Sequence, residues 1–134
     1  MRLCVPAAFF LVVAACSGGG GGSATPTSTP TPVPTPGITA HWVVNKAGGC
    51  GAVPGAASIS ILATLQGTAS AYQGTAPCLG TTSAGIIAVV VPSSGTYSVI
   101  GSLLNSGAAS IADSAVQSVA VSGAASINVS ITPP

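Results

Sequence analysis

The stretch Ala57-Ser58-Ile59-Ser60-Ile61-Leu62-Ala63-Thr64-Leu65 alternates apolar residues with small polar ones. Successive side chains of a β-strand point to opposite faces, so the pattern predicts a strand with one face on an apolar core and the other in solvent. Leu62 is the one residue that breaks the alternation. Serine, threonine and β-branched residues recur here with period two, which does not favour a helix.

Segments on both sides of this stretch carry the same signal. In Ile38–Val44 the alternation directs Trp42 inward and His41 outward, and in the last segment it directs Ile127, Val129 and Ile131 inward. Turn residues such as Gln66-Gly67 and Pro92-Ser93-Ser94-Gly95 separate the segments. We therefore expect an all-β protein, with a single antiparallel β-sandwich of about seven strands over residues 38–134.

Three segments receive more specific predictions. Thr68–Ala76 has small residues around Tyr72 and is predicted to be a weak strand at a sheet edge. Gly85–Val91 is nearly all apolar, which is typical of a central strand covered on both faces. The strand expected over Ala108–Val121 should contain a bulge or break near Ala115.

A family resemblance rests on the step Gly95-Thr96-Tyr97 after a tight turn, followed by an Asn-Ser-Gly turn and a final pair of strands. This arrangement resembles the carboxypeptidase-regulatory-like, transthyretin-like group of β-sandwiches. The whole chain also looks similar to uncharacterised bacterial lipoproteins. The resemblance implies an Ig-like or transthyretin-like sandwich in an accessory or structural role, and it implies no ligand residue.

The N-terminus has the features of an export signal. Arg2 precedes an apolar run from Leu3 to Val13 that is too short to span a bilayer. Val13-Ala14-Ala15-Cys16 resembles the lipobox of bacterial lipoproteins, which implies cleavage of a signal peptide, residues 1–15, and diacylation of the Cys16 sulfur. The alternative is an ordinary secretory signal in which Cys16 has no role.

Residues 16–37 are predicted to be a disordered linker. They contain a run of five glycines and then a Thr/Pro-rich tract that extends as polyproline II. The linker would act as a spacer between a membrane and the folded domain. The alternatives are an unselected low-complexity tract and a Pro-rich peptide ligand, and the threonines could carry O-glycans.

Cysteine usage predicts one disulfide. Cys4 would leave with the signal and Cys16 would be acylated, so Cys50 and Cys78 remain as the thiols of an exported domain. Pairing is the default in an oxidising compartment. A redox or metal pair is the weaker reading, because the chain has no Cys-x-x-Cys spacing and only His41 and Asp113 could complete a metal site.

Charge is almost absent from this chain of 134 residues. Arg2, Lys46 and Asp113 are its only charged side chains at neutral pH, and Arg2 belongs to the signal. The phosphates of a nucleic acid require many basic side chains, so no nucleic acid is expected as a partner. Electrostatic recruitment to anionic lipid head groups is excluded for the same reason.

The sequence offers little for catalysis, and we expect no enzyme, cofactor or metal. A hydrolase triad of a serine, His41 and Asp113 can be written, but no Gly-x-Ser-x-Gly elbow accompanies it. Trp42 is expected in the core. The alternative is a carbohydrate-binding module in which Trp42 or Tyr72 stacks on a sugar, with Tyr72 as the exposed aromatic.

Together these features predict a lipid-anchored, non-enzymatic β-sandwich of the bacterial cell envelope, acting as a structural or interaction module. Its partners would be the membrane, through Cys16, and an envelope protein or glycan. Ser17 after the cysteine resembles the signal for outer-membrane sorting in enteric-type bacteria.

Overall fold

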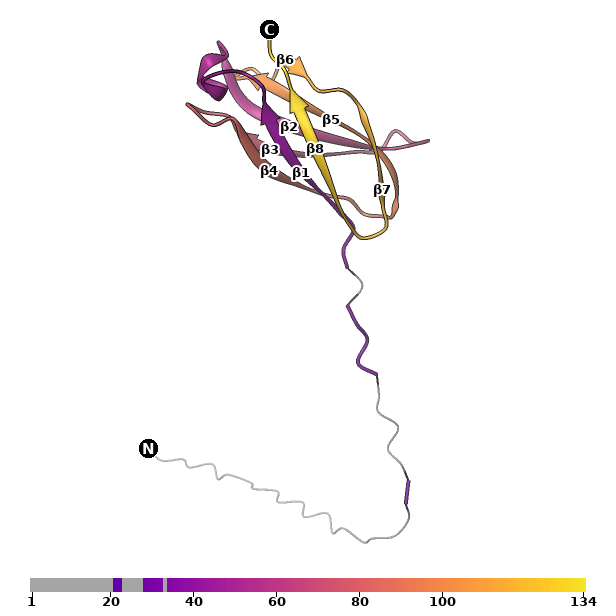
Figure 1. Ribbon diagram of the computed structural model, residues 1–134. Coiled ribbons are helices and arrows are strands. Elements are labelled where there is room, and N and C mark those ends of the chain that lie inside the picture. The colour runs from indigo at the N-terminus through magenta and orange to yellow at the C-terminus, as the bar shows by residue number, and fades with distance from the viewer. Residues whose placement is uncertain (1–20, 23–27, 33) are drawn as a thin grey trace, which may run out of the picture. The chain divides into compact units, whose positions relative to one another are not determined.

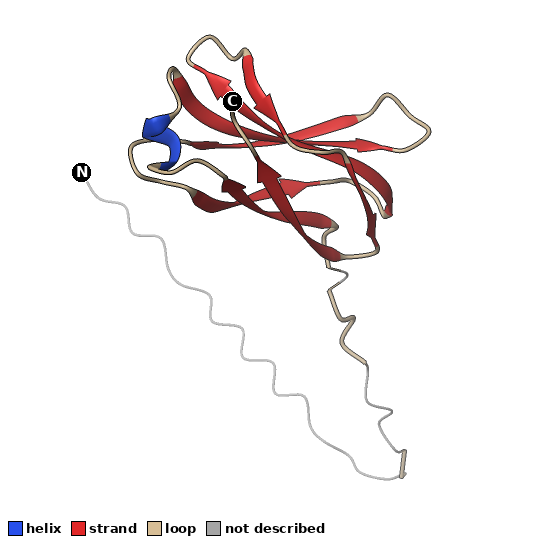
Figure 2. Cartoon of the chain, turned by 45° about the horizontal axis from the view of Figure 1, so that its top comes forward, coloured by secondary structure: helices blue, strands red, loops and turns tan. Residues whose placement is uncertain are grey.

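Two β-sheets pack face to face in the folded part of the chain (Figures 1 and 2). The computed structural model describes residues 21–22, 28–32 and 34–134. The signal peptide, Cys16 and most of the Gly-rich segment lie outside the described residues. Residues 32–134 form one compact unit.

Eight strands and one short 3-10 helix make up this unit. In chain order they are β1 (Gly37–Val44), η1 (Gly49–Ala52), β2 (Ala56–Leu65), β3 (Ala71–Pro77), β4 (Ala84–Val90), β5 (Gly95–Asn105), β6 (Ser110–Asp113), β7 (Gln117–Val121) and β8 (Ala124–Ile131). A three-stranded sheet, here called sheet A, has the order β4-β1-β8. A five-stranded sheet, sheet B, has the order β3-β2-β5-β6, with β7 also paired to β5. The predicted all-β sandwich is confirmed.

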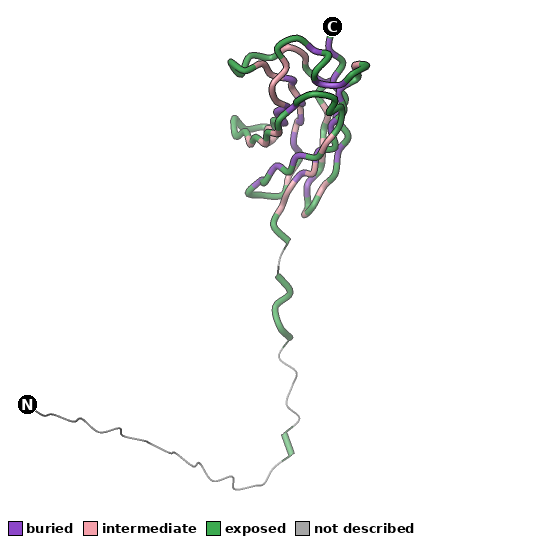
Figure 3. Tube along the Cα trace, turned by 90° about the vertical axis from the view of Figure 1, so that its left-hand side faces the viewer, coloured by how far each residue is buried: buried purple, intermediate pink, exposed green. Residues whose placement is uncertain are grey.

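The core lies between the two sheets and follows the predicted alternation. In β2 the side chains of Ile59, Ile61 and Ala63 are fully buried, whereas Leu62 points outward and is 36% exposed. Trp42 in β1 and Val129 in β8 are also buried. Figure 3 shows the buried residues recurring along the strands. The period-two pattern therefore identified the inner face of each sheet correctly.

The eighth strand arises where a break was predicted. The segment expected as one strand over Ala108–Val121 divides into β6 and β7, separated at Ser114. Ser114 is buried, and its hydroxyl oxygen accepts a hydrogen bond of 2.9 Å from the main-chain N–H of Gly101. The main-chain N–H of Ser114 in turn donates to the carbonyl oxygen of Gly101. The hydroxyl therefore replaces a main-chain carbonyl oxygen as the acceptor for Gly101. The ladder with β6 ends here, and β5 pairs next with β7.

The prediction for β4 was wrong. This strand is at the edge of sheet A rather than at its centre, and only its inner face is covered. Ile87 and Val89 are buried, but Ile86 is 62% exposed and Val90 is 70% exposed. A run of apolar residues resembles a doubly covered strand whether or not anything covers its second face. The weak strand β3 was predicted at an edge and lies at the edge of sheet B.

One strand pair departs from an antiparallel arrangement. β1 and β8 pair in parallel, in register from Gly37 with Ala124 to Val44 with Ile131. They are the first and last strands of the domain and no hairpin joins them, so no turn imposes an antiparallel direction. This pairing places β1 at the centre of sheet A.

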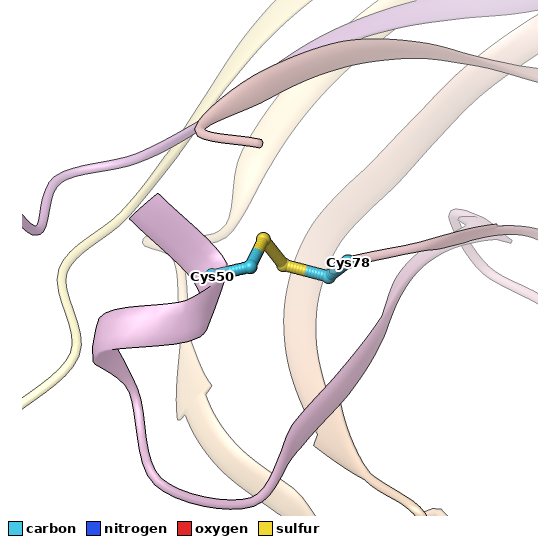
Figure 4. The surroundings of a disulfide bond; sticks show 2 residues. All are labelled: Cys50 and Cys78. Carbon is cyan, nitrogen blue, oxygen red and sulfur yellow. A yellow bond between two sulfur atoms is a disulfide. The ribbon is translucent and has the colours of Figure 1, made fainter. Parts of the chain in front are cut away.

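The predicted disulfide between Cys50 and Cys78 is present (Figure 4). Cys50 lies in η1, on the connection from β1 in sheet A to β2 in sheet B, and Cys78 begins the return connection from β3 to β4. Their Cα atoms are 5.4 Å apart and both residues are buried. The bridge therefore joins two crossings between the sheets. In the chain-entropy model, closing its loop stabilises the fold by about 3.5 kcal/mol.

Candidate functional site

The outer face of sheet A carries a hollow of about 550 Å³. It is lined by His41, Trp42, Val43, Ala84, Gly85, Ile86, Asn128, Val129 and Ser130. The residues come from all three strands of the sheet, with β1 in the middle. A hollow of this size lies within the range of small-molecule and peptide-side-chain sites, so it is the candidate functional site.

Strand register determines which side chains meet in the hollow. His41 in β1 pairs with Ile86 in β4 and with Asn128 in β8, so these three residues form a row across the sheet. Val43 pairs with Ala84 on one side and Ser130 on the other and forms the next row. Residues two apart on a strand share a face, so both rows point away from the core.

The two sides of this face differ in chemistry. On the β4 side the exposed residues are apolar, including Ile86, Val90 and two alanines, and Val43 beside them is 39% exposed. On the β8 side they are polar, including Ser126, Asn128 and Ser130. Branched apolar side chains exposed together on one face are a mark of interaction surfaces.

The polar side chains of the hollow differ in whether they form hydrogen bonds with other described residues. The Asn45 amide donates hydrogen bonds to the hydroxyls of Ser130 and Thr132 and so occupies one end of the polar side. In the part of the chain that the structure describes, no hydrogen bond involves the side chain of His41 or of Asn128. Both side chains combine donor and acceptor atoms and carry them exposed at the surface.

Trp42 lies beneath the hollow and belongs to the core, as predicted. It is 3% exposed and its ring packs against Gly85, the residue opposite it on β4. Its indole Nε1 is buried without a hydrogen-bond partner among the described residues. A sugar ring stacks on an exposed aromatic face, and this indole has none to offer.

Tyr72 is not the exposed aromatic that the sequence suggested. It is half-buried on the inner face of β3 and packs edge-on against Tyr97, with ring centroids 6.3 Å apart. Tyr97 is fully buried, and its hydroxyl donates a hydrogen bond of 2.8 Å to the carbonyl oxygen of Ser93. The Tyr72 ring therefore has a packing role that uses part of its surface.

The structure separates the residues of the hypothetical hydrolase triad. His41 is on the outer face of sheet A. Asp113 pairs with Ser102 of β5, whose neighbours Gly101 and Leu103 are buried, so it lies on the outer face of sheet B. The apolar core stands between the two side chains, which excludes a hydrogen bond between them. A triad of His41 and Asp113 is therefore wrong for this fold.

The two charged side chains of the described residues, Lys46 and Asp113, also lie apart from the hollow. The hydroxyl of Ser110 donates a hydrogen bond of 2.7 Å to the Asp113 carboxylate, and hydrogen bonds from Ser102 and Ser110 lower the pKa of Asp113. The Lys46 ammonium donates to the main-chain oxygen of Pro134, at 2.6 Å. Neither charge contributes to the hollow.

Two kinds of feature are absent from the described residues. They contain no group of three His, Cys, Asp or Glu residues placed to hold a metal ion. Within the same residues, no helix has the length and apolar character needed to cross a membrane.

Sequence reasoning found part of this site. It placed His41 on an outward face, and the alternation that directs Ile127 and Val129 inward places Asn128 outward as well. It did not bring the two together, and it assigned Ile86 to a covered strand. The alternation within this strand was a usable signal. Only one of two adjacent strand residues can face the core, so if Ile87 faces the core, Ile86 must face outward.

Comparison with known protein families, curated proteins and solved structures finds no match to this chain.

Proposed function

We propose that this chain is a lipid-anchored, non-enzymatic interaction module of the bacterial cell envelope, with the outer face of sheet A as its binding surface. The observation that carries the proposal is the hollow around His41, where exposed apolar side chains adjoin the side chains of His41 and Asn128, which form no hydrogen bond among the described residues. Such a surface can bury apolar area and supply hydrogen bonds to a partner.

The anchor is the second part of the proposal and rests on the sequence. The lipobox-like Val13-Ala14-Ala15-Cys16 favours acylation of Cys16, and Ser17 favours the outer membrane. Each buried methylene contributes about 0.8 kcal/mol to membrane binding, so two or more acyl chains hold a protein stably. The Gly-rich and Thr/Pro-rich residues that follow would set the distance between the lipid and the domain.

A role without catalysis agrees with the placement of the ionisable groups. General acid–base or nucleophilic chemistry needs two or more such groups within hydrogen-bond reach of one another. His41, Lys46 and Asp113 lie on different parts of the domain and share no contact among the hydrogen bonds of the described residues. Binding requires no such cluster.

Membership of the carboxypeptidase-regulatory-like, transthyretin-like group is part of the proposal. Its support is the step Gly95-Thr96-Tyr97, which opens β5 directly after a turn. Tyr97 is anchored there by its hydrogen bond to Ser93, which gives the step a structural purpose.

Metabolic labelling tests the anchor. Cells that express the full chain are supplied with [3H]palmitate, and the label is expected in the wild type and in Cys4→Ala but not in Cys16→Ala. Cys4→Ala is the matched control because it changes the other cysteine of the N-terminal segment. Label retained in Cys16→Ala, or a native protein that begins at Met1, would contradict the proposal.

Copurification tests the binding face. The acylated chain is extracted from native membranes in mild detergent, and the molecules bound to it are compared for Ile86→Lys and Leu62→Lys. Both residues are exposed apolar side chains in strands, but Leu62 lies on the outer face of sheet B. We expect Ile86→Lys to lose the bound molecules and Leu62→Lys to retain them. Equal retention by both variants would place the binding surface elsewhere.

A further inference from the structure

We propose that the partner of this surface is a second copy of the same chain, packed sheet A against sheet A. The inference rests on the proposed function, because it uses both the binding face and the lipid anchor. It adds the identity of the partner and the geometry of the contact.

Charge favours contact between two copies of this face. No Asp, Glu, Lys or Arg occupies an outward position on β1, β4 or β8. A charged group near a two-fold axis is brought close to its own copy, and such a juxtaposition of like charges is unfavourable. Sheet A can meet itself without this penalty, and its apolar side chains would be removed from water.

The distribution of side chains selects one symmetry. A two-fold axis that runs across the strands, level with the row of Ile86, His41 and Asn128, places β4 over β4 and β8 over β8. Apolar residues then face apolar residues, and polar residues face polar ones. An axis along β1 would instead place the apolar side over the polar side. The first arrangement brings Ile86 of one copy opposite Ile86 of the other.

The size of the face explains why the partner should be another anchored copy. Three strands about 4.8 Å apart, with about eight residues of 3.3 Å each, give a face of roughly 400 Å². Stable complexes between free proteins bury about 800 Å² on each partner. This face is too small for that, so its partner must be concentrated by other means. The same lipid anchor would hold a second copy in the same membrane at high effective concentration.

The outer face of sheet B is a poorer surface for such a contact. Its polar side chains already bond to one another, as Gln66 does to Ser98 and Ser118. It also carries the Asp113 carboxylate, which would be brought near its copy or buried against an apolar surface.

Disulfide trapping in native membranes tests the pairing. The full chain is expressed with Ile86→Cys or with the control Leu62→Cys, and covalent dimers are measured on non-reducing gels. We expect roughly tenfold more dimer from Ile86→Cys, because only this position meets its own copy in the proposed contact. In the Cys16→Ala background the Ile86→Cys dimer should fall to the level of the control. Thermal unfolding of each variant confirms that the new cysteine leaves the fold intact.

The possible results separate the two proposals. Cross-linking of Ile86→Cys mainly to a different polypeptide would overturn pairing with a second copy and leave the binding face in place. Equal amounts of dimer from both cysteine variants would also overturn the pairing, because random collisions would account for them. No cross-link from Ile86→Cys to any protein, with palmitate still incorporated, would overturn the pairing while the anchor remained. The binding face would then stand or fall with the copurification of Ile86→Lys, which does not require a thiol on the partner.

Discussion

The two outer faces of the sandwich are built from similar residues but differ in how many of their side chains are occupied. On sheet B the Gln73 amide donates to the Ser60 hydroxyl at 2.7 Å, and Ser110 donates to Asp113. On sheet A the side chains of His41 and Asn128 make no hydrogen bond within the described residues. Polar side chains that hydrogen-bond to one another have few donors and acceptors left for a partner. Polar side chains without such bonds, next to exposed apolar residues, can still bind one.

The largest loss of stability should come from removing the disulfide between Cys50 and Cys78, which links the two connections between the sheets. In the double variant Cys50→Ala/Cys78→Ala, the loop between sheets A and B is no longer closed in the unfolded chain. We expect the free energy of unfolding to fall by about 3.5 kcal/mol, which corresponds to a decrease in Tm of roughly 15–25 °C. Thermal unfolding of the variant and the wild type measures the decrease in Tm. An unchanged Tm would show that the contacts between the sheets hold both faces without the bridge.

A smaller loss of stability should follow from adding a methyl group beneath the hollow, where Gly85 packs against Trp42. A Cβ at Gly85 would lie 2.7 Å from Cζ2 of Trp42, so Gly85→Ala forces the indole or β4 to shift. Overpacking of this kind costs about 1–3 kcal/mol. Gly37→Ala is the matched control on the neighbouring strand, because its Cβ would meet only an ordinary contact of 3.7 Å. Equal unfolding midpoints for both variants in urea would contradict the close packing of Trp42 on Gly85.

A direct test of the comparison removes one polar group from each face. Ser60→Ala deletes the acceptor of the Gln73 amide at a residue that is only 5% exposed, and we expect a loss of about 1 kcal/mol. Asn128→Ala removes an exposed amide without a partner and should change stability by less than about 0.5 kcal/mol. Urea unfolding compares the two. The distinction between the faces would fail if Asn128→Ala were as costly as Ser60→Ala.

The smallest effect concerns acid stability on sheet B. Hydrogen bonds from Ser102 and Ser110 lower the pKa of Asp113 in the folded protein. The stabilisation is therefore fully present above the ordinary aspartate pKa of about 3.9 and is lost as the pH falls through the lower folded pKa. Asp113→Asn should be less stable than the wild type at about pH 6 and closer to it at about pH 2.5. A difference that stayed constant with pH would exclude a role of the carboxylate charge.

The features of this fold that could be predicted are those that depend on residues close together in the sequence. The alternation in β2 and β8 identified their inner faces, and the break in the segment before β8 was expected near Ala115 and is found at Ser114. The position of β4 was not predictable in this way, because an edge and a centre differ only in what lies beside the strand. The candidate site has the same character, since the three strands that form its two rows of side chains come from segments far apart in the chain.

By itself the sequence determined that the domain is made of strands, which residues face its core, that two cysteines pair, and that almost no charge is present. These properties follow from local periodicity and composition. Only the tertiary structure decided that β1 lies between β4 and β8, that His41 meets Ile86 and Asn128, and that Asp113 lies on the opposite face. The physical reason is that strand pairing depends on contacts between distant segments, and a period of two specifies a face without specifying a neighbour.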